Sequence, residues 1–128
     1  SGAKQLWKLP LDARRTQSSP VIYQGHVYLT GGENHLCVDI TNGKVKWREK
    51  RQSTISSPLI VDGKMITLEK KGSELVMIKA SPKAHEELVK ARVKTMWCPS
   101  PVVSNGRLYL RMADHVACYN LAQKLPLP

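Results

Sequence analysis

A short unit is repeated three times along this chain, and this repeat constrains the fold more than any other feature. Each copy opens with a Ser-Pro pair, and the pairs lie 38 and 43 residues apart. Five residues after each proline stands a glycine, which is followed by a run of alternating polar and apolar residues. The pairs are Ser19-Pro20, Ser57-Pro58 and Ser100-Pro101. A period near 40 residues that is built from short β-runs is typical of β-propellers and related repeat arrays.

The first copy divides into four short β-runs. They cover residues 20–23, 26–30, 35–39 and 44–48, and every gap between them contains a glycine. This alternation with tight turns predicts antiparallel strands. Four such strands in about 30 residues make one propeller blade, the architecture that WD40 propellers also use. The sequence therefore predicts an all-β fold made of three β-propeller blades.

Residues that recur in every copy are expected to have structural roles, because repetition across units indicates a shared backbone. The glycines supply turns, and the prolines stand at the start of each innermost strand. Trp7 and Trp47 lie 40 residues apart at matched positions, so both are expected to pack between blades. The expected structural residues are Trp7, Trp47, Gly25, Gly63, Gly106, Pro20, Pro58 and Pro101.

The blade boundaries follow from the repeat. Blade 1 is predicted at residues 19–50, blade 2 at 57–95 and blade 3 at 100–121, where the sequence shows no fourth strand. Residues 4–9 are predicted to form an orphan outer strand with no blade in front of it. Since propellers close with roughly 4–8 blades, we expect a C-terminal fragment of a longer protein. The complementary ends also permit a homodimer, in which two chains exchange N-terminal strands and form a six-bladed ring.

The third turn of the second copy is longer than its counterpart in the first. Ser81-Pro82 followed by acidic residues has the signature of a helix start, with serine as the cap and proline at the first helical position. We therefore expect a short helical insert near 82–90, which is followed by a strand around 89–94.

The chain carries 20 basic and 10 acidic residues, a net charge of +10. Binding to acidic polymers is one reading of this charge, and it predicts retention on heparin that collapses with salt. The lysines lie mainly in turns and outward strand positions, however, and no aromatic residues are interleaved with them as in single-strand binders. We therefore expect a solvated surface and no nucleic-acid partner. No apolar stretch approaches the ~18 residues of a membrane span, and no signal-peptide pattern is visible.

Cysteines and histidines follow no catalytic or metal-binding pattern. Cys37 and Cys118 occupy the same place in different copies, so we expect them in separate blades as small buried hydrophobic residues. Cys98 completes an odd count. The four histidines lack ligand spacing, and no nucleophile-elbow pattern is present. We expect no metal ligand and no catalytic residue in this chain.

The candidate binding residues lie in the loops that lead into the innermost strands, at 14–18, 53–56 and 95–99. Trp97 stands where the other copies have threonine, and a large aromatic there can line the mouth of a central channel. We select Trp97, Gln17 and Ile55 as binding residues for a protein or small-ligand partner on this loop face. Local packing of Trp97 is the structural alternative.

The string from Cys37 to Trp47 resembles a known repeat. It reads Cys-Val-Asp-Ile-Thr-Asn-Gly-Lys-Val-Lys-Trp, and the quinoprotein-type repeat reads Ala-x-Asp-x-x-Thr-Gly-Lys-x-x-Trp, called the tryptophan-docking motif. In that motif the tryptophan of the outermost strand packs against the neighbouring blade. The stretch from Lys79 to Val93 resembles the helical-insert variant in PQQ-like propeller proteins of bacteria, and the end of the chain looks like their C-terminal blade. The resemblance covers roughly residues 5–121.

This resemblance implies one of two branches. The dehydrogenases of the family bind pyrroloquinoline quinone (PQQ) and calcium at the ring centre, with an aspartate as base, Glu and Asn as metal ligands, and often a Cys-Cys pair. This chain has no Cys-Cys pair, and its innermost strands carry apolar residues. Its acids are expected in turns or outer segments, at Glu33, Asp39, Asp62, Glu69, Glu74 and Asp114. The other branch resembles the outer-membrane assembly lipoprotein propeller, a docking platform without enzymatic activity.

We therefore expect a non-catalytic binding or scaffold module of an exported bacterial PQQ-like repeat protein, without a cofactor. The resemblance implies a periplasmic or exported location. The alternative is a fragment of a PQQ-dependent dehydrogenase, whose catalytic residues, quinone and calcium belong to blades outside this sequence.

Overall fold

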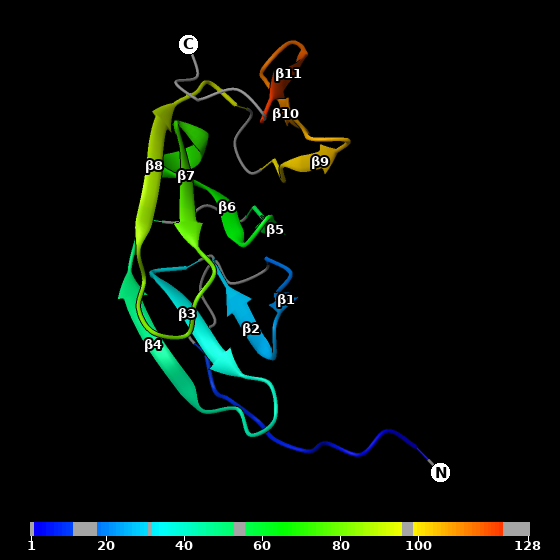
Figure 1. The fold of residues 1–128 in the computed structure, drawn as a ribbon, viewed down its shortest axis with the longest axis vertical. Helices are drawn as coiled ribbons and strands as arrows, with labels where there is room; N and C mark the ends of the chain where they lie inside the picture. Colours follow the sequence, from blue (N-terminus) through cyan, green and yellow to red (C-terminus); the bar gives the residue numbers. More distant parts are fainter. Residues whose placement is uncertain (1, 12–17, 31, 53–55, 96–98, 122–128) are drawn as a thin grey trace.

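The computed structural model describes residues 2–11, 18–30, 32–52, 56–95 and 99–121 of the 128-residue chain. Within these ranges the protein is almost entirely β, with three antiparallel sheets that follow one another along the chain (Figure 1). The predicted all-β class is confirmed.

Each sheet is one blade. Blade 1 contains β1 (Val21–Tyr23), β2 (His26–Leu29), β3 (Asn34–Asp39) and β4 (Val45–Lys50), paired in that order. Blade 2 contains β5 (Leu59–Val61), β6 (Lys64–Glu69), β7 (Glu74–Lys79) and β8 (Glu87–Arg92), with a short 3-10 turn η1 (Lys70–Gly72) after β6. Blade 3 contains β9 (Val102–Ser104), β10 (Arg107–Arg111) and β11 (Val116–Asn120) within the described residues.

The recurring glycines close the first hairpin of every blade. Gly25, Gly63 and Gly106 have φ values of +76°, +70° and +71°, and the residue before each of them also has a positive φ. Two successive positive φ values define the two-residue type I′ turn, whose twist matches that of the flanking strands. Glycine is favoured at the second position because it adopts this conformation without steric cost.

Blades 1 and 2 meet across a mixed aromatic and aliphatic cluster. Blade 1 contributes Tyr28 and Cys37, which are 1% and 0% exposed, and blade 2 contributes Met65, Val76 and Ile78. The blade 2 residues alternate along β6 and β7, as the period of two in a strand requires. The opposite face of the same two strands is therefore available for the next blade.

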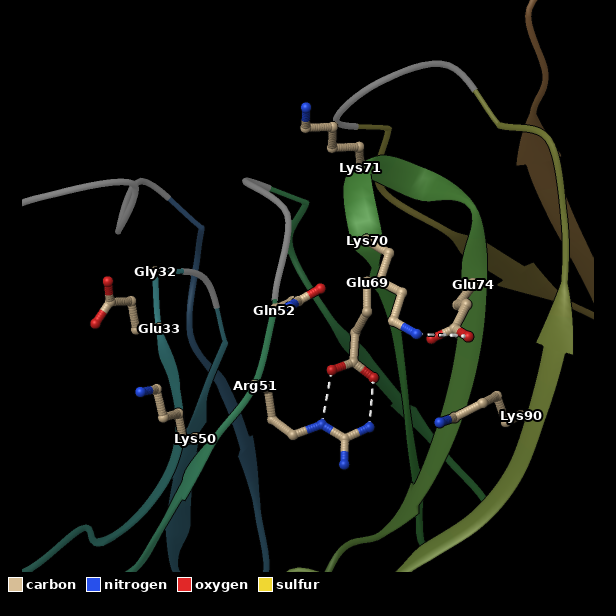
Figure 2. Close-up of a pocket in the computed structure, with 10 residues that line it drawn as sticks. All are labelled: Gly32, Glu33, Lys50, Arg51, Gln52, Glu69, Lys70, Lys71, Glu74 and Lys90. Atoms are coloured by element: carbon tan, nitrogen blue, oxygen red, sulfur yellow. Dashed lines mark hydrogen bonds and ion pairs between the residues drawn. The ribbon is translucent and has the colours of Figure 1, made fainter.

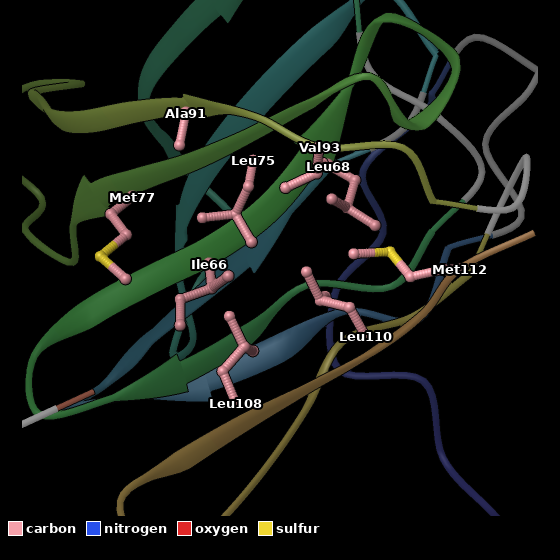
Figure 3. Close-up of a cluster of buried hydrophobic side chains, with 9 residues drawn as sticks. All are labelled: Ile66, Leu68, Leu75, Met77, Ala91, Val93, Leu108, Leu110 and Met112. Carbon is pink, nitrogen blue, oxygen red and sulfur yellow. The ribbon is translucent and has the colours of Figure 1, made fainter. Parts of the chain in front are cut away.

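Blades 2 and 3 meet across a cluster whose buried members are all aliphatic, with the partly buried Tyr119 packed against it (Figure 3). Its members come from β6, β7, β8 and β10 and from the residues that directly follow β8 and β10: Ile66, Leu68, Leu75, Met77, Ala91, Val93, Leu108, Leu110 and Met112. Blade 2 is thus covered on both faces, and the core of the molecule lies at the two blade boundaries rather than in one central body.

Two outer segments, residues 4–9 and β4, each donate an indole hydrogen bond to the blade that follows. Trp47 Nε1 on β4 donates to the Ser81 carbonyl of blade 2 at 2.7 Å, and Trp7 Nε1 donates to the Ile40 carbonyl of blade 1 at 2.9 Å. Ile40 directly follows β3 and Ser81 lies two residues after β7, so both acceptors lie in the turn that follows the third strand of a blade. Gly43 leaves room for Trp7, because a Cβ atom at Gly43 would lie 2.6 Å from the indole Cε3.

The predicted helical insert near 82–90 is wrong. Residues 82 and 83 form a bend, residues 81 and 84–86 are assigned no regular secondary structure, and β8 begins at Glu87. The Ser81 carbonyl, which would accept the first hydrogen bond of a helix, accepts the Trp47 indole instead. Glu86 O accepts from Lys79 N at 2.9 Å, which closes the loop between β7 and β8. Tertiary contacts therefore override the local helix signal.

Two further expectations from the sequence, for Cys118 and for residues 4–9, differ from the structure. Cys37 is buried as expected, but Cys118 is exposed, because no blade covers that face of blade 3 within the described residues. Cys98 lies outside the described residues. Residues 4–9, expected as an outer strand, are assigned no strand, and they run beyond blade 1 at the opposite end of the molecule from blade 3 (Figure 1).

Candidate functional site

A cleft of about 930 Å³ opens between blades 1 and 2, on the edge where β4 leads into the connection to β5 (Figure 2). Charged side chains dominate its lining: Glu33, Lys50, Arg51, Glu69, Lys70, Lys71, Glu74 and Lys90, together with Gly32 and Gln52. The cleft is therefore lined mainly by charged residues, unlike the hydrophobic clusters between the blades.

The floor of the cleft is an arginine held by two carboxylates from the other blade. Arg51 Nε and Nη2 donate to the two Glu69 oxygens at 2.7 Å each, and Nη2 also donates to Glu87 Oε1 at 2.8 Å. The Glu69 side chain is 3% exposed and that of Arg51 is 18% exposed. Hydrogen bonding to Glu69 raises the pKa of Arg51, and hydrogen bonding to Arg51 lowers the pKa of Glu87. This bidentate pair fixes blade 1 against blade 2.

Glu69 was expected in a turn or outer segment, and this expectation is wrong. The residue is buried at the end of β6, where its carboxylate completes the Arg51 fork. The sequence carries one signal for it, since Glu69 ends a strand whose preceding residues are mostly apolar. A carboxylate at the end of such a strand needs a cationic partner if it is buried.

The upper rim of the cleft is a left-handed turn. Lys70, Lys71 and Gly72 in η1 have φ values of +51°, +57° and +85°. The left-handed conformation costs an L-residue other than glycine roughly 1–2 kcal/mol. Hydrogen bonds retain the turn, with Lys70 N donating to Gln52 O at 2.8 Å and Thr95 Oγ1 donating to Gly72 O at 2.7 Å. Backbone strain of this kind clusters at binding and active sites.

The rim lysines differ in how their charges are balanced. Lys70 pairs with Glu74 at 3.3 Å, and Lys90 approaches Glu87 at 3.9 Å. Within the described ranges, Lys50 and Lys71 form no ion pair. They stand on opposite sides of the cleft, Lys50 from β4 and Lys71 from η1 (Figure 2). Two ammonium groups without ion pairs on facing rims suit an anionic ligand, which would be attracted mainly by their charge.

A pair of histidines joins the same two blades close to Arg51. His35 Nδ1 on β3 lies 3.1 Å from His85 Nε2 in the loop before β8, and the His85 ring meets the Trp47 ring edge-on at 5.2 Å. His35 is 0% exposed, and its Nε2 finds no hydrogen-bond partner among the described residues. Burial, then His85 and Arg51, lower the pKa of His35 to about 3, and burial likewise lowers the pKa of His85. Both rings are therefore neutral at pH 7.

The sequence-selected binding residues Gln17, Ile55 and Trp97 lie outside the described residues, so they stay predictions. Gln52, which lines the cleft, directly precedes the predicted loop 53–56 in the sequence. The structure thus draws attention to Arg51, Lys50 and Lys71, which the sequence interpretation did not select as binding residues. Their only sequence signal was the general excess of basic residues.

The described residues do not fit a quinone and calcium centre. The innermost strands β1, β5 and β9 carry mainly aliphatic residues and no carboxylate. No group of three or more His, Cys, Asp or Glu side chains among the described residues has the arrangement of a metal site. Calcium takes six to eight oxygen ligands with carboxylates among them, and these strands supply none from side chains of that kind.

The family described as outer membrane protein assembly factor BamB matches residues 1–86. No curated protein matches the chain. In the described residues, no helix has the length and apolar character needed to cross a membrane.

Solved structures share the fold at low sequence identity. BamB from Moraxella catarrhalis is 14% identical with a TM-score of 0.62, and the match covers 80% of this chain and 33% of that one. The computationally designed Ika8 protein is 12% identical with a TM-score of 0.63, covering 94% and 37%. Quinohemoprotein alcohol dehydrogenase from Comamonas testosteroni is 13% identical with a TM-score of 0.61, covering 83% and 19%. The chain thus spans about a third or less of these structures.

Proposed function

Because the chain belongs to the family of the outer membrane protein assembly factor BamB, we propose that it is a non-catalytic propeller module that binds an acidic segment of a partner protein. The binding place is the cleft between blades 1 and 2. The observation that carries this proposal is a pair of lysines, Lys50 and Lys71, which form no ion pair with any described residue and stand on facing rims above the buried Arg51–Glu69 fork. Family membership also supports an exported, periplasmic location.

The charge of the site favours a segment with several carboxylates. One exposed ion pair contributes only about 0–1 kcal/mol, so a single carboxylate would bind too weakly to be held. An extended acidic segment can meet Lys50 and Lys71 together, and the net charge of +10 attracts it over a longer range. Such binding is expected to weaken with salt, because the Debye length shortens to about 8 Å at physiological ionic strength.

Fluorescently labelled hexaglutamate tests this proposal by anisotropy titration at low and physiological salt. The double variant Lys50→Gln/Lys71→Gln is expected to bind about 5- to 30-fold more weakly, the loss of two surface pairs. The matched control is Lys46→Gln/Lys83→Gln, which removes the same charge from exposed positions outside the cleft. An equal loss in both double variants, or no binding by the unmodified chain, would contradict the cleft as the site.

Heparin separates this proposal from general attraction to acidic polymers. Retention on heparin that both double variants lose equally indicates a diffuse basic surface.

A role in quinone chemistry is the second candidate, since the same fold occurs in quinohemoprotein alcohol dehydrogenase. The residues that hold the quinone would then belong to blades outside this sequence, so PQQ with calcium is expected to raise the melting temperature of a longer chain that includes those blades.

A further inference from the structure

The outermost strand of blade 1 has one edge that no described strand pairs with. β4 pairs with β3 alone in its sheet, and it lies at the outer margin of the blade, on the side away from β1 (Figure 1). The described blades meet across the faces of their sheets and not along this margin. Further blades that stack in the same way would leave this edge unpaired, so the feature does not depend on how many blades the whole protein contains.

The hydrogen bonds of blade 1 determine which residues of β4 turn their backbone toward the open edge. In an antiparallel pair, hydrogen-bonded positions alternate with positions that are not bonded. Arg51 N donates to Glu33 O at 2.9 Å, and the register with β3 continues without a shift from Lys50 back to Trp47. Arg48 and Lys50 therefore fall between the bonded positions, and their N–H and C=O groups point outward, away from β3.

The open stretch of this edge has two defined ends. The register with β3 shifts between Cys37 and Val38, where Lys46 has no partner in the pairing. At the other end, Gln52 O accepts a hydrogen bond from Lys70 N of blade 2 at 2.8 Å, beside the cleft. An extended segment that pairs with the stretch between these ends would lie along β4 and have one end at the cleft.

Both residues that face the open edge are basic. Arg48 and Lys50 are exposed, and neither forms an ion pair with any described residue. Their side chains share one face of the strand because they are two residues apart, whereas Glu49 points to the opposite face. Basic residues on an edge oppose pairing with another basic edge. The same residues favour a strand with carboxylates opposite them, because opposite charges across a strand pair attract.

We propose that the acidic segment adds to β4 as an antiparallel fifth strand of blade 1, with acidic side chains at every second residue. This inference rests on the function proposed above and specifies the sequence pattern of the partner. Two acidic residues of the segment stand opposite Arg48 and Lys50 and exchange both backbone hydrogen bonds with them. The residue between them stands opposite Glu49, where an uncharged side chain avoids repulsion. Beyond Lys50, the segment enters the cleft and meets Lys71.

Two labelled peptides of equal composition test the alternation by anisotropy at low salt. One contains four glutamate-threonine pairs, and the other contains four glutamates followed by four threonines. The alternating peptide is expected to bind about 2- to 5-fold more tightly, because the block peptide places a glutamate opposite Glu49. Equal or tighter binding of the block peptide would overturn the proposed pattern.

N-methylation of the alternating peptide tests the strand pairing without a change of charge. Methyl groups on the glutamate nitrogens remove the N–H groups that would donate to Arg48 O and Lys50 O, and they are expected to weaken binding at least about 5-fold. Methyl groups on the threonine nitrogens are the matched control, because those N–H groups point away from β4. Equal losses from the two patterns, or a larger loss from the methylated threonines, would overturn the added strand.

The variant Arg48→Gln connects the effect to β4. It is expected to weaken binding of the alternating peptide about 2- to 5-fold. The control Arg107→Gln removes an exposed arginine from β10, a strand that is paired on both sides, and should leave binding unchanged. Unchanged binding by Arg48→Gln would overturn the proposal.

Failure of this inference can be told apart from failure of the cleft as a binding site. Hexaglutamate binding that Lys50→Gln/Lys71→Gln weakens, together with equal losses from the two methylation patterns, would retain the cleft and overturn the added strand. No binding of hexaglutamate or of either peptide by the unmodified chain would overturn both proposals.

Discussion

At the scale of single residues, Lys71 combines backbone strain with a charge that no described residue neutralises in an ion pair. Its left-handed conformation suits glycine, and its ammonium group stands on the rim of the cleft. Lys71→Gly is therefore expected to raise the free energy of unfolding by about 0.5–1 kcal/mol, after the greater entropy of glycine in the unfolded chain is subtracted. The same change is expected to weaken hexaglutamate binding as much as Lys71→Gln does. Urea unfolding and anisotropy measure the two effects, and a loss of stability would show that the turn is not strained.

The Arg51–Glu69 pair belongs to the same scale, because its effect depends on one buried carboxylate. Arg51→Met leaves the Glu69 side chain, only 3% exposed, without its bidentate partner. The free energy of unfolding is expected to fall by about 3 kcal/mol, since an uncompensated buried charge is costly. The double variant Arg51→Met/Glu69→Met is expected to recover much of this loss. The exposed pair of Lys64 and Asp62 provides the control, because Lys64→Met should change stability by less than about 1 kcal/mol. Equal losses in the single and double variants would contradict this account.

At the scale of strands and turns, the sequence predicted those features that depend only on residues close together in the chain. The period of two and the glycine turns placed the strands, because a type I′ hairpin needs only adjacent residues. The prediction of a helix near 82–90 was wrong because Trp47, which is far away in the sequence, donates a hydrogen bond to the Ser81 carbonyl. Arg51, Lys50 and Lys71 were not selected because a cleft between blades is formed by residues from separate repeats. The repeat placed Cys118 correctly but not its exposure, since exposure depends on what covers blade 3.

Gly43 offers a test of the contact between the N-terminal segment and blade 1. Both Gly43→Ala and the control Gly25→Ala force alanine into a similar positive φ, +74° and +76°. Only at Gly43 would the added Cβ clash with Trp7, whereas nothing lies within 4 Å at Gly25. Gly43→Ala is expected to destabilise the protein by about 1 kcal/mol more than Gly25→Ala. In a Trp7→Ala background this difference should vanish, and a double-mutant cycle from urea unfolding measures it. A difference that survives would place its cause elsewhere than Trp7.

At the scale of the whole molecule, the two blade boundaries differ in kind. The boundary between blades 2 and 3 is mainly aliphatic. At equivalent positions, Val89 of β8 pairs with Met77 in blade 2, and Trp47 of β4 pairs with Cys37 in blade 1. The boundary between blades 1 and 2 adds the His35–His85 hydrogen bond and the Arg51 fork. Acid acts on imidazoles and carboxylates but not on aliphatic side chains. The boundary between blades 1 and 2 is therefore expected to open before the boundary between blades 2 and 3 as the pH falls.

The sign of this pH dependence follows from His35. In the unfolded chain it binds a proton near its ordinary pKa of 6.5, and in the folded protein only near 3, so the unfolded state holds more protons between these values. The free energy of unfolding should thus fall by about 2 kcal/mol between pH 7 and pH 5 through this residue alone. Arg51 also opposes protonation of His85, whereas Glu49, Glu69 and Glu87 favour it. His35→Leu is expected to flatten the fall in urea unfolding experiments, while His115→Gln, a 60% exposed histidine in blade 3, should leave it in place. Hydrogen exchange at pH 5 locates the effect, because amides of blade 1 should lose protection before those of blade 3. Two outcomes would show that the imidazole pair does not control the boundary between blades 1 and 2. One is an unchanged dependence of the unfolding free energy on pH in His35→Leu, and the other is a loss of protection in blade 3 before blade 1.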